Sequence, residues 1–316
     1  MTSTERSSRG SSVRLAVVSA VAGLALCHGA FAAEDQFSFT YTTDLLPKHQ
    51  LEMEQTTTWK FTKNGGTFDM LQNVTEFEYG VTDALQMAVD VNWDWTHAFH
   101  NGPDHATTPP EQFSDNNPDP DAHFHGARLE AVSLEAEYRI LSPYTNPVGL
   151  AVLLEPERGE LFKELTAKVI LQKNFLDDRL TTSFNFTYSP EWRWLLNADG
   201  VTKSWQEETD VNYYFATSYR FAPNWSVGAE FLNEHEYGSS FHFTNEFNSG
   251  YYLGPTVHFG GKKFFLTATF VRQMPWATNH VGTIPGAVVN HYDFDNDFEK
   301  YRLRLKFAYY FGEGET

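Results

Sequence analysis

The sequence has almost no cysteine and few basic side chains for its length. Cys27 is the single cysteine, so no disulfide can join two parts of the chain. Only 23 of the 316 residues are lysine or arginine, against 41 aspartates and glutamates, which gives a formal net charge of −18. This balance argues against nucleic acid as a partner and against a polybasic surface for anionic lipids. Because no disulfide can form within the chain, the stability of the fold must come from backbone pairing and packing.

Long apolar segments are also missing. Beyond the N-terminal region no stretch offers 18 consecutive apolar residues, which excludes a helical membrane protein. Aromatic residues, in contrast, make up 16% of the chain. They would form either the core of a soluble domain or the two interfacial girdles of a membrane barrel.

The N-terminus has the three parts of a secretory signal peptide. Residues 1–14 carry three arginines, residues 15–27 are apolar, and the segment ends in Ala30-Phe31-Ala32, a small-x-small cleavage pattern. We expect cleavage after Ala32, which leaves a signal peptide at 1–32 and one domain at 33–316. A lipoprotein would use Cys27, but Leu26 stands where a small residue is required.

Hydrophobic periodicity distinguishes a soluble sheet from a membrane barrel. In residues 301–311 every odd position is apolar or aromatic, while Arg302, Arg304 and Lys306 occupy the alternate face. A buried strand of a soluble sandwich rarely places three cations on one face. A barrel strand with lipid outside and water inside does so naturally. The same period of two recurs at 51–61, 85–95, 132–140 and 210–221.

The alternation predicts an all-β fold, a transmembrane antiparallel up-and-down β-barrel of about twelve strands. An even number is what bacterial single-chain barrels require, and most of the segments are long enough to cross a membrane when tilted. The predicted strands are 48–62, 67–81, 84–99, 124–141, 148–158, 161–175, 180–194, 205–222, 225–237, 250–260, 262–274 and 297–311.

The connections between these strands differ at the two ends. Five connections on one side are short and rich in turn formers: 81–83, 142–147, 176–179, 222–224 and 260–262. The four longest fall on the other side: 100–123, 195–204, 238–249 and 275–296. Outer-membrane barrels have short periplasmic turns and long external loops, so we expect an outer-membrane protein of a Gram-negative bacterium with both termini periplasmic.

Three stretches of the chain resemble a known but uncharacterised family of proteobacterial outer-membrane barrels. They are Thr42–Trp59, Glu76–Val91 and Gly254–Met274. The resemblance implies the location and the fold, and brings no established activity. The chain departs from the pattern at His49, where such relatives tend to have glycine. More distantly it is similar to porin-like proteins encoded near genes for degrading aromatic compounds, which favours transport.

The lumen is where a function has to be sought. The alternation points eight acids of the first four strands inward: Glu52, Glu54, Glu76, Glu78, Asp90, Asp94, Glu135 and Glu137. It also points Arg302, Arg304 and Lys306 inward from the last strand, which must close against the first. One interpretation is a structural ladder that fills a narrow lumen. The other is a small pore with an acidic wall and a basic stripe, open to small polar or cationic solutes.

Two further sets of residues suggest other chemistry. The connection after the third strand is rich in imidazoles that could hold Zn²⁺ or Cu²⁺: His97, His100, His105, His123 and His125. Its Asn, Asp and Pro content is equally typical of a solvated surface loop. A lipid hydrolase would need a His–Ser pair, and His235 lies near Ser239 and Ser240, although no nucleophile motif surrounds them.

We therefore expect a non-enzymatic, porin-like channel without a cofactor. The alternative is a closed barrel that is structural or binds a ligand or metal. Its partners would be outer-membrane lipids, the barrel-assembly machinery and small polar solutes. The sequence leaves open whether residues 34–47 form a further strand or fold inward as a plug, and it leaves the oligomeric state open.

The last strand supplies a test of assembly. Phe307, Tyr309 and Phe311 resemble the aromatic end signal that the barrel-assembly machinery reads, although five residues follow. Deleting 297–311 is expected to abolish insertion into the outer membrane, whereas deleting 312–316 is not. Membrane fractionation and heat-modifiable migration on gels measure the result, and equal effects of the two deletions would contradict the idea.

Overall fold

The computed structural model describes residues 36–63, 65–102, 105–110, 113, 119–240, 246–277, 294–295 and 297–312. The predicted signal peptide and its cleavage site after Ala32 lie outside these residues. So do parts of the predicted 100–123 and 238–249 connections and most of 275–296.

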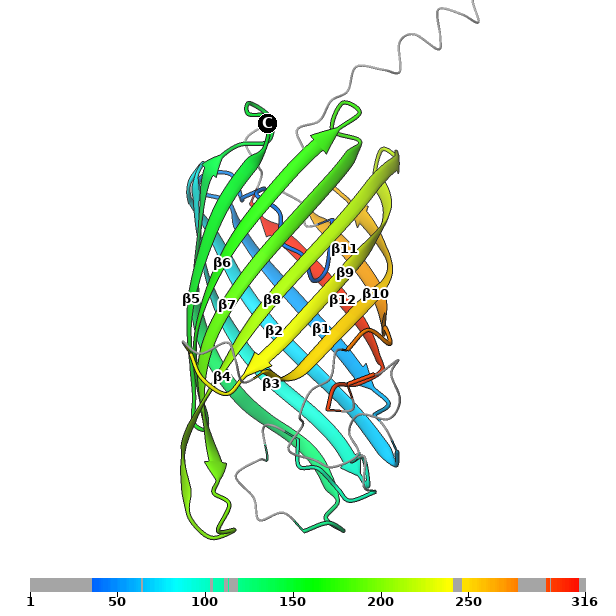
Figure 1. Ribbon diagram of the computed structural model, residues 1–316. Helices are drawn as coiled ribbons and strands as arrows, with labels where there is room; N and C mark the ends of the chain where they lie inside the picture. The colour runs from blue at the N-terminus through cyan, green and yellow to red at the C-terminus, as the bar shows by residue number, and fades with distance from the viewer. Residues whose placement is uncertain are drawn as a thin grey trace, which may run out of the picture. The chain divides into compact units, whose positions relative to one another are not determined.

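Twelve strands form one closed barrel in which each strand pairs antiparallel with its neighbours in sequence and β12 pairs with β1 (Figure 1). The strands are β1 (Leu51–Phe61), β2 (Thr67–Thr82), β3 (Leu85–Phe99), β4 (Phe124–Leu141), β5 (Gly149–Gly159), β6 (Phe162–Phe175), β7 (Leu180–Leu196), β8 (Lys203–Ala222), β9 (Trp225–Tyr237), β10 (Glu246–Gly260), β11 (Phe264–Gln273) and β12 (Tyr301–Phe311). The predicted fold class is confirmed.

The predicted strand ends are least accurate at β10 and β12. β10 begins at Glu246, before the predicted 250, because Glu246 still pairs with Tyr237 across a bulge. β12 begins at Tyr301 and not at 297, because the Asp297 amide donates to the carboxylate of Asp295 and leaves the ladder (3.0 Å). Among the described residues no helix is long and apolar enough to span a membrane.

The two ends of the barrel differ in the length of their connections. At one end, which we call the turn end, strands are joined by 83–84, 142–148, 176–179, 223–224 and 261–263. At the other, the loop end, the connections include 100–123, 197–202, 238–245 and 274–300. Residue 50 precedes β1 and residue 312 follows β12, so the chain enters and leaves the barrel at the turn end.

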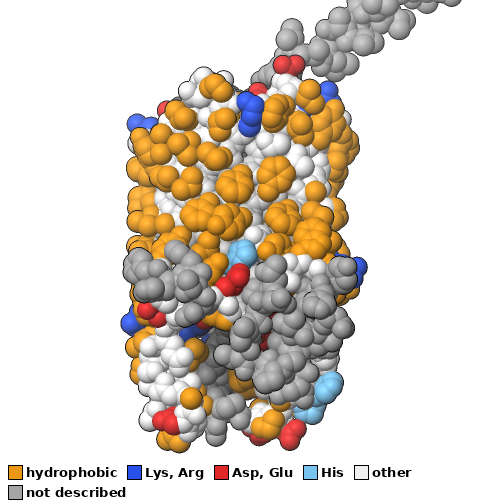
Figure 2. Space-filling view, in the orientation of Figure 1, with side chains coloured by type: hydrophobic (Ala, Val, Ile, Leu, Met, Phe, Trp, Pro, Cys, Tyr) orange, Lys and Arg blue, Asp and Glu red, His pale blue; other side chains and the backbone are white. Residues whose placement is uncertain are grey.

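The outer wall is apolar and the inner wall is polar. Hydrophobic side chains cover most of the visible wall, and charged ones lie mainly toward its ends (Figure 2). Leu134, for example, is 55% exposed, whereas its neighbours Ser133 and Glu135 are buried on the inner side. A folded soluble monomer does not expose so much contiguous apolar surface, so this wall is suited to contact with lipid.

Residues 36–47, which we call the plug, lie inside the barrel and form neither strand nor helix. Phe37 is fully buried, and Phe39 and Leu46 are nearly so. Phe39 packs with Leu232 and Tyr252 of the wall, and Leu46 packs with Phe265. The segment that the sequence left undecided between a strand and a plug is therefore a plug.

The plug joins β1 through a tight bend at His49. The backbone of His49 has φ of 71°, the left-handed region that favours glycine. Its amide donates to the Gly80 carbonyl (2.7 Å), and the Gly80 amide donates to the Gln50 carbonyl (3.0 Å). A Cβ at position 80 would collide with the Pro47 carbonyl, so Gly80 is what allows the chain to pass this close.

Substitutions at position 49 test this account of the bend. A side chain in the left-handed region costs about 1 kcal/mol relative to glycine. His49→Gly removes this strain and also loses the hydrogen bond from the ring to Tyr79 Oη (2.8 Å). His49→Ala loses the same hydrogen bond but keeps the strain, so it is expected to be less stable than His49→Gly by about 1 kcal/mol. Urea unfolding in lipid vesicles measures the difference, and two equally stable variants would refute it.

Candidate functional site

The plug is held first by one buried carboxylate on β9. Glu230 is completely buried, and its two oxygens accept the backbone amides of Ser38 (2.8 Å), Phe39 (3.0 Å) and Thr40 (2.9 Å). The hydroxyls of Thr40 and of Thr269 on β11 donate to it as well. Because this one side chain accepts three successive backbone amides, Glu230 is the main anchor of the plug.

Further along the plug, amide side chains of the wall accept hydrogen bonds from its backbone, as Glu230 does. Each presents its carbonyl oxygen to a plug amide: Asn185 to Tyr41 (2.7 Å), Gln172 to Thr43 (2.7 Å) and Gln86 to Leu46 (2.8 Å). These acceptors lie on β7, β6 and β3, so the plug crosses the lumen and does not extend the sheet at one edge. A buried amide without an acceptor would cost stability, and the wall provides one for each of these amides.

Cationic side chains of the wall contact the aromatic rings of the plug. The Arg304 guanidinium lies 3.9 Å from the centre of the Phe39 ring and donates to the Ser38 carbonyl (3.2 Å). The Lys168 ammonium lies 3.2 Å from the centre of the Tyr41 ring. Cation–π contacts of this kind are stronger where water is excluded. The plug is thus fixed by its backbone and by its side chains.

The plug separates two cavities of unequal size. The larger, which we call the loop-side chamber, has a volume of about 400 Å³ and includes Phe39 in its lining. The smaller, the turn-side cavity, has about 30 Å³ and is lined partly by Tyr41 and Leu46. A small organic solute fits in the first volume, whereas the second holds only water. Plug residues thus line both a space of solute size and a space that holds only water.

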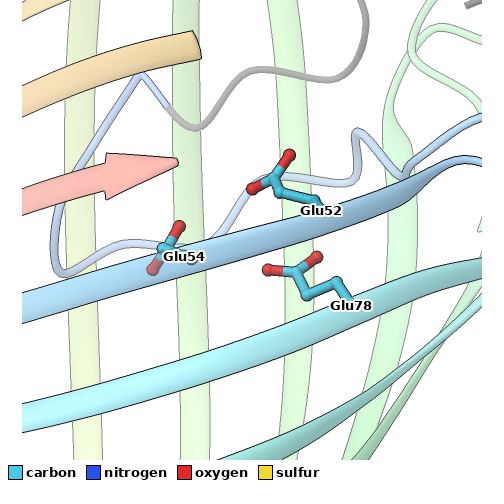
Figure 3. A group of neighbouring side chains, drawn as sticks. All are labelled: Glu52, Glu54 and Glu78. Carbon is cyan, nitrogen blue, oxygen red and sulfur yellow. The ribbon is translucent and has the colours of Figure 1, made fainter. Parts of the chain in front are cut away.

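The eight acids selected from the sequence lie on the inner side of the barrel, and five of them line the turn-side cavity: Glu52, Glu76, Glu78, Glu135 and Glu137. Glu52, Glu54, Asp90, Asp94, Glu135 and Glu137 are buried. Glu76 and Glu78 are partly buried and line the cavity. Carboxylate oxygens of Glu52, Glu54 and Glu78 lie within 4.8 Å of one another, on the adjacent strands β1 and β2 (Figure 3). We call these three residues the turn-side carboxylates.

A second acidic group lies on the other side of the plug, and the sequence analysis did not single it out. Oxygens of Glu208, Asp210 and Glu236 lie within 4.8 Å of one another on β8 and β9 and line the loop-side chamber. We call them the loop-side carboxylates. Glu164 and Glu191 line the same chamber. The alternation along 205–222 could have identified Asp210 as inward, because it follows the rule applied to the first four strands.

The basic side chains of β12 do not form one stripe facing the acidic wall, as the sequence suggested. Lys306 pairs across the closing seam with Glu54 (3.1 Å). Arg302 reaches Glu234 of β9, past two intervening strands, through two bonds of 2.6 and 2.7 Å. Arg304 donates to Thr58 (2.7 Å) and holds the plug, as described above. Each base therefore has its own partner.

Arg302 also contacts Glu299, which precedes β12. Burial is the largest single influence and by itself would raise the pKa of Glu299, but the Arg302 guanidinium, together with Lys60, Lys63 and a backbone hydrogen bond, outweighs it and holds the pKa at about 2. Glu299 is consequently ionised at any physiological pH. Arg302, Glu234 and Glu299 form an ion-paired side wall of the loop-side chamber.

The five histidines proposed as metal ligands do not converge on one point. His97 and His123 face each other with their Nε2 atoms 2.8 Å apart, and the His125 ring lies 5.4 Å from that of His97. His100 instead bonds to Asp121 (3.0 Å). His105 belongs to a different part of the loop, next to Gly65. In this arrangement the five rings are divided among three places, with His97, His123 and His125 together and His100 and His105 apart from them.

The candidate hydrolase residues are engaged otherwise. The ring of His235 contacts the carboxylate of Glu246 and the side-chain oxygen of Asn233 (2.9 Å). The Ser240 hydroxyl donates to Glu207. His258 is buried on the inner side and bonds to Thr267 (2.8 Å). The His235–Ser240 pair that the sequence suggested is not arranged as a base and a nucleophile.

Solved structures similar to this one are outer-membrane barrels. An outer-membrane channel from Pseudomonas putida F1 is 12% identical, with a TM-score of 0.53, and the match covers 85% of this chain and 98% of that one. The NanC porin is 7% identical, with a TM-score of 0.47, and the match covers 81% of this chain and 98% of that one. At such identities the likeness concerns the fold alone.

Comparison by sequence gives a family and no individual relative. No curated protein matches the chain. A family model does match it over residues 29–311, nearly the whole barrel with its plug. The chain belongs to that family, a family of unknown function (DUF6662).

Proposed function

We propose that this protein is an outer-membrane channel for the passive diffusion of small polar solutes, cations in particular, and that the plug holds it closed in the arrangement described here. After export and loss of residues 1–32, the barrel-assembly machinery inserts it with both termini in the periplasm. The apolar outer wall supports contact with outer-membrane lipids, and the unequal connections support this orientation.

The observation that carries the proposal is the presence of carboxylates on both sides of the plug. The turn-side and the loop-side carboxylates each bring three acidic side chains within 4.8 Å. Fixed negative charge in a confined, partly dry lumen attracts cations and resists the entry of anions. The basic side chains of β12 cancel only part of this negative charge, because the buried acids of the inner wall outnumber them.

The plug must shift for a solute to pass. The loop-side chamber accommodates a small solute at about 400 Å³, but the turn-side cavity of about 30 Å³ does not. The plug carries no strand pairing and is held by side chains of the wall, so it can leave without breaking the barrel ladder. Conduction then depends on how often these bonds break together.

A closed structural barrel is the second candidate, and the same anchoring supports it. A plug fixed at Glu230, Asn185, Gln172 and Gln86 would stay in place if these bonds never broke together. Such a protein would stabilise the membrane or bind a partner through its loops. Planar-bilayer recording separates the two, because only the channel gives conductance steps.

Neutralising the inner acids tests the selectivity. A variant with Glu76→Gln, Glu78→Gln, Asp90→Asn and Asp94→Asn is expected to show a severalfold lower permeability for cations relative to anions, because the fixed field is weakened. Reversal potentials in a salt gradient measure the ratio. A matched control neutralises four acids outside the inner wall: Glu160, Asp177, Asp178 and Asp199. An effect of equal size in both variants, or anion preference of the unmodified protein, would contradict the proposal.

Locking the plug tests the gate. An ideal Cβ at Gly149 lies 2.6 Å from Thr43 Oγ1, close to the separation of about 3 Å between Cβ and the far sulfur of a disulfide. The pair Thr43→Cys and Gly149→Cys is therefore expected to form a disulfide after a small shift of the Pro143 ring. Conductance should fall to near zero under oxidising conditions and return with a reductant.

The two single variants serve as controls, since each carries the same steric change without a bond. Because the only natural cysteine lies in the predicted signal peptide, no other disulfide can form in the mature chain. A doubly substituted protein that conducts equally when oxidised and reduced, with the disulfide verified by mass spectrometry, would exclude the plug as a gate.

A further inference from the structure

Three histidines gather on the outside of the barrel at the loop end. His97 is near the end of β3, His125 stands directly opposite it on β4, and His123 immediately precedes β4. Along β3 the residues beside His97, Thr96 and Ala98, are buried on the inner side. His97 therefore points outward, and His123 and His125 are exposed. We call these three residues the outer imidazole cluster.

The cluster is held in shape by its aromatic neighbours. Trp95 presents its ring edge-on to His125, with the centroids 5.4 Å apart. Phe99 packs edge-on against His123 at 5.2 Å. The ring centroids of His97 and His123 are 4.9 Å apart. These contacts place three imidazoles on one small patch of the wall, away from both cavities.

The partners of these rings distinguish them from other histidines. His100 faces a carboxylate, His49 a phenol and His258 a hydroxyl, so each of those rings contacts an oxygen. In the described part of the chain, the one polar contact recorded for the His97 and His123 rings is the 2.8 Å approach of their Nε2 atoms. Two nitrogen lone pairs repel each other at this distance unless a proton or a metal ion lies between them.

A shared proton is the simpler explanation, and it accounts for two rings. One ring donates and the other accepts, which a distance of 2.8 Å permits. It gives no role to His125, whose ring lies 5.4 Å from that of His97. A metal ion bound at 2.0–2.1 Å by two imidazoles in tetrahedral geometry separates the nitrogens by about 3.3 Å. The observed pair needs to open by only about half an ångström. The nitrogens of all three rings do not yet lie within 4.8 Å of one another, so the exposed His125 ring must turn toward the pair to become a third ligand.

We propose that His97, His123 and His125 bind one transition-metal ion, Zn²⁺ or Cu²⁺, on the outer wall at the loop end. Imidazole is a preferred ligand of both ions, and three ligands leave a position open to water. The site differs from the five-histidine loop site expected from the sequence, because His100 and His105 are not part of it. It is also independent of conduction through the lumen.

Binding there would have a structural consequence for the loop. The connection between β3 and β4 leaves the barrel after Phe99 and returns at Phe124, so a metal ion would join its two ends. Thr108, Pro109 and Pro110 of this connection line the loop-side chamber. An ion there would thus hold together the two ends of a connection that contributes to the lining of the chamber.

The test is titration of the purified, untagged, refolded barrel with Zn²⁺ by calorimetry and with Cu²⁺ by electron paramagnetic resonance. The expected result is one saturable ion per chain, with nitrogen hyperfine structure in the copper spectrum and a raised melting temperature with either ion. His97→Ala and His123→Ala should each weaken the affinity about tenfold or more. Heat-modifiable migration on gels verifies that each variant is folded.

The matched controls are His100→Ala and His105→Ala, which remove imidazoles from the same loop. They should leave affinity and spectrum unchanged. The proposal is overturned if the folded barrel binds no stoichiometric ion, since a shared proton then explains the pair. It is also overturned if binding survives in His97→Ala and His123→Ala, or is lost in the two controls.

Discussion

A backbone amide that is removed from water needs a hydrogen-bond acceptor, and the structure of this protein follows from how that need is met in two places. In the wall, closing β12 against β1 leaves no unpaired edge, which is the condition for a sheet to lie in lipid. Inside the barrel, the plug has no neighbouring strand to pair with. Six of its amides donate instead to carboxylate and amide side chains that the wall directs inward.

Charge inside the barrel follows from the same separation of faces. Because alternate side chains must face either lipid or lumen, the ionised groups of the strands collect on the inner side. Acids outnumber bases there, and the bases that exist are positioned by specific partners. Arg302 ties β12 to β9, Lys306 closes the seam, and Arg304 fixes the plug. The remaining carboxylates, on both sides of the plug, give the lumen its negative character.

The strands could be predicted because lipid and lumen impose a period of two on the sequence. All twelve were found in this way, and the two largest errors, at the starts of β10 and β12, fall where a bulge or a side-chain bond replaces the ladder, as at Glu246 and Asp297. The plug could not be predicted, since its contacts with the wall are set by the closed barrel and leave no periodic trace. In the sequence Glu230 does not differ from the other inward acids. Only the structure shows that its carboxylate accepts the backbone amides of Ser38, Phe39 and Thr40.

For the residues of the lumen, the sequence could predict which face of a strand they occupy but not which side chains they contact. The structure has the eight acids chosen by alternation on the inner side of the barrel. Whether each carboxylate lies next to other carboxylates or next to a base depends on side chains across the lumen, which alternation does not specify. Arg302 illustrates this, because its partner Glu234 lies three strands away around the barrel. The pairing of His97 with His125 needed the register of β3 on β4, which the sequence does not specify.

The bend at residues 47–50 makes the plug a ligand that is permanently attached to its own binding site. Ser38 and Glu230 are 192 residues apart in sequence, yet once the seam is closed the only flexible connection between them is the short segment that leads back to β1. A short tether of this kind keeps the local concentration of the plug in the millimolar range. A separate molecule that bound to the same acceptors of the wall would therefore compete with a plug whose effective concentration is millimolar, even if its own hydrogen bonds were equally well placed.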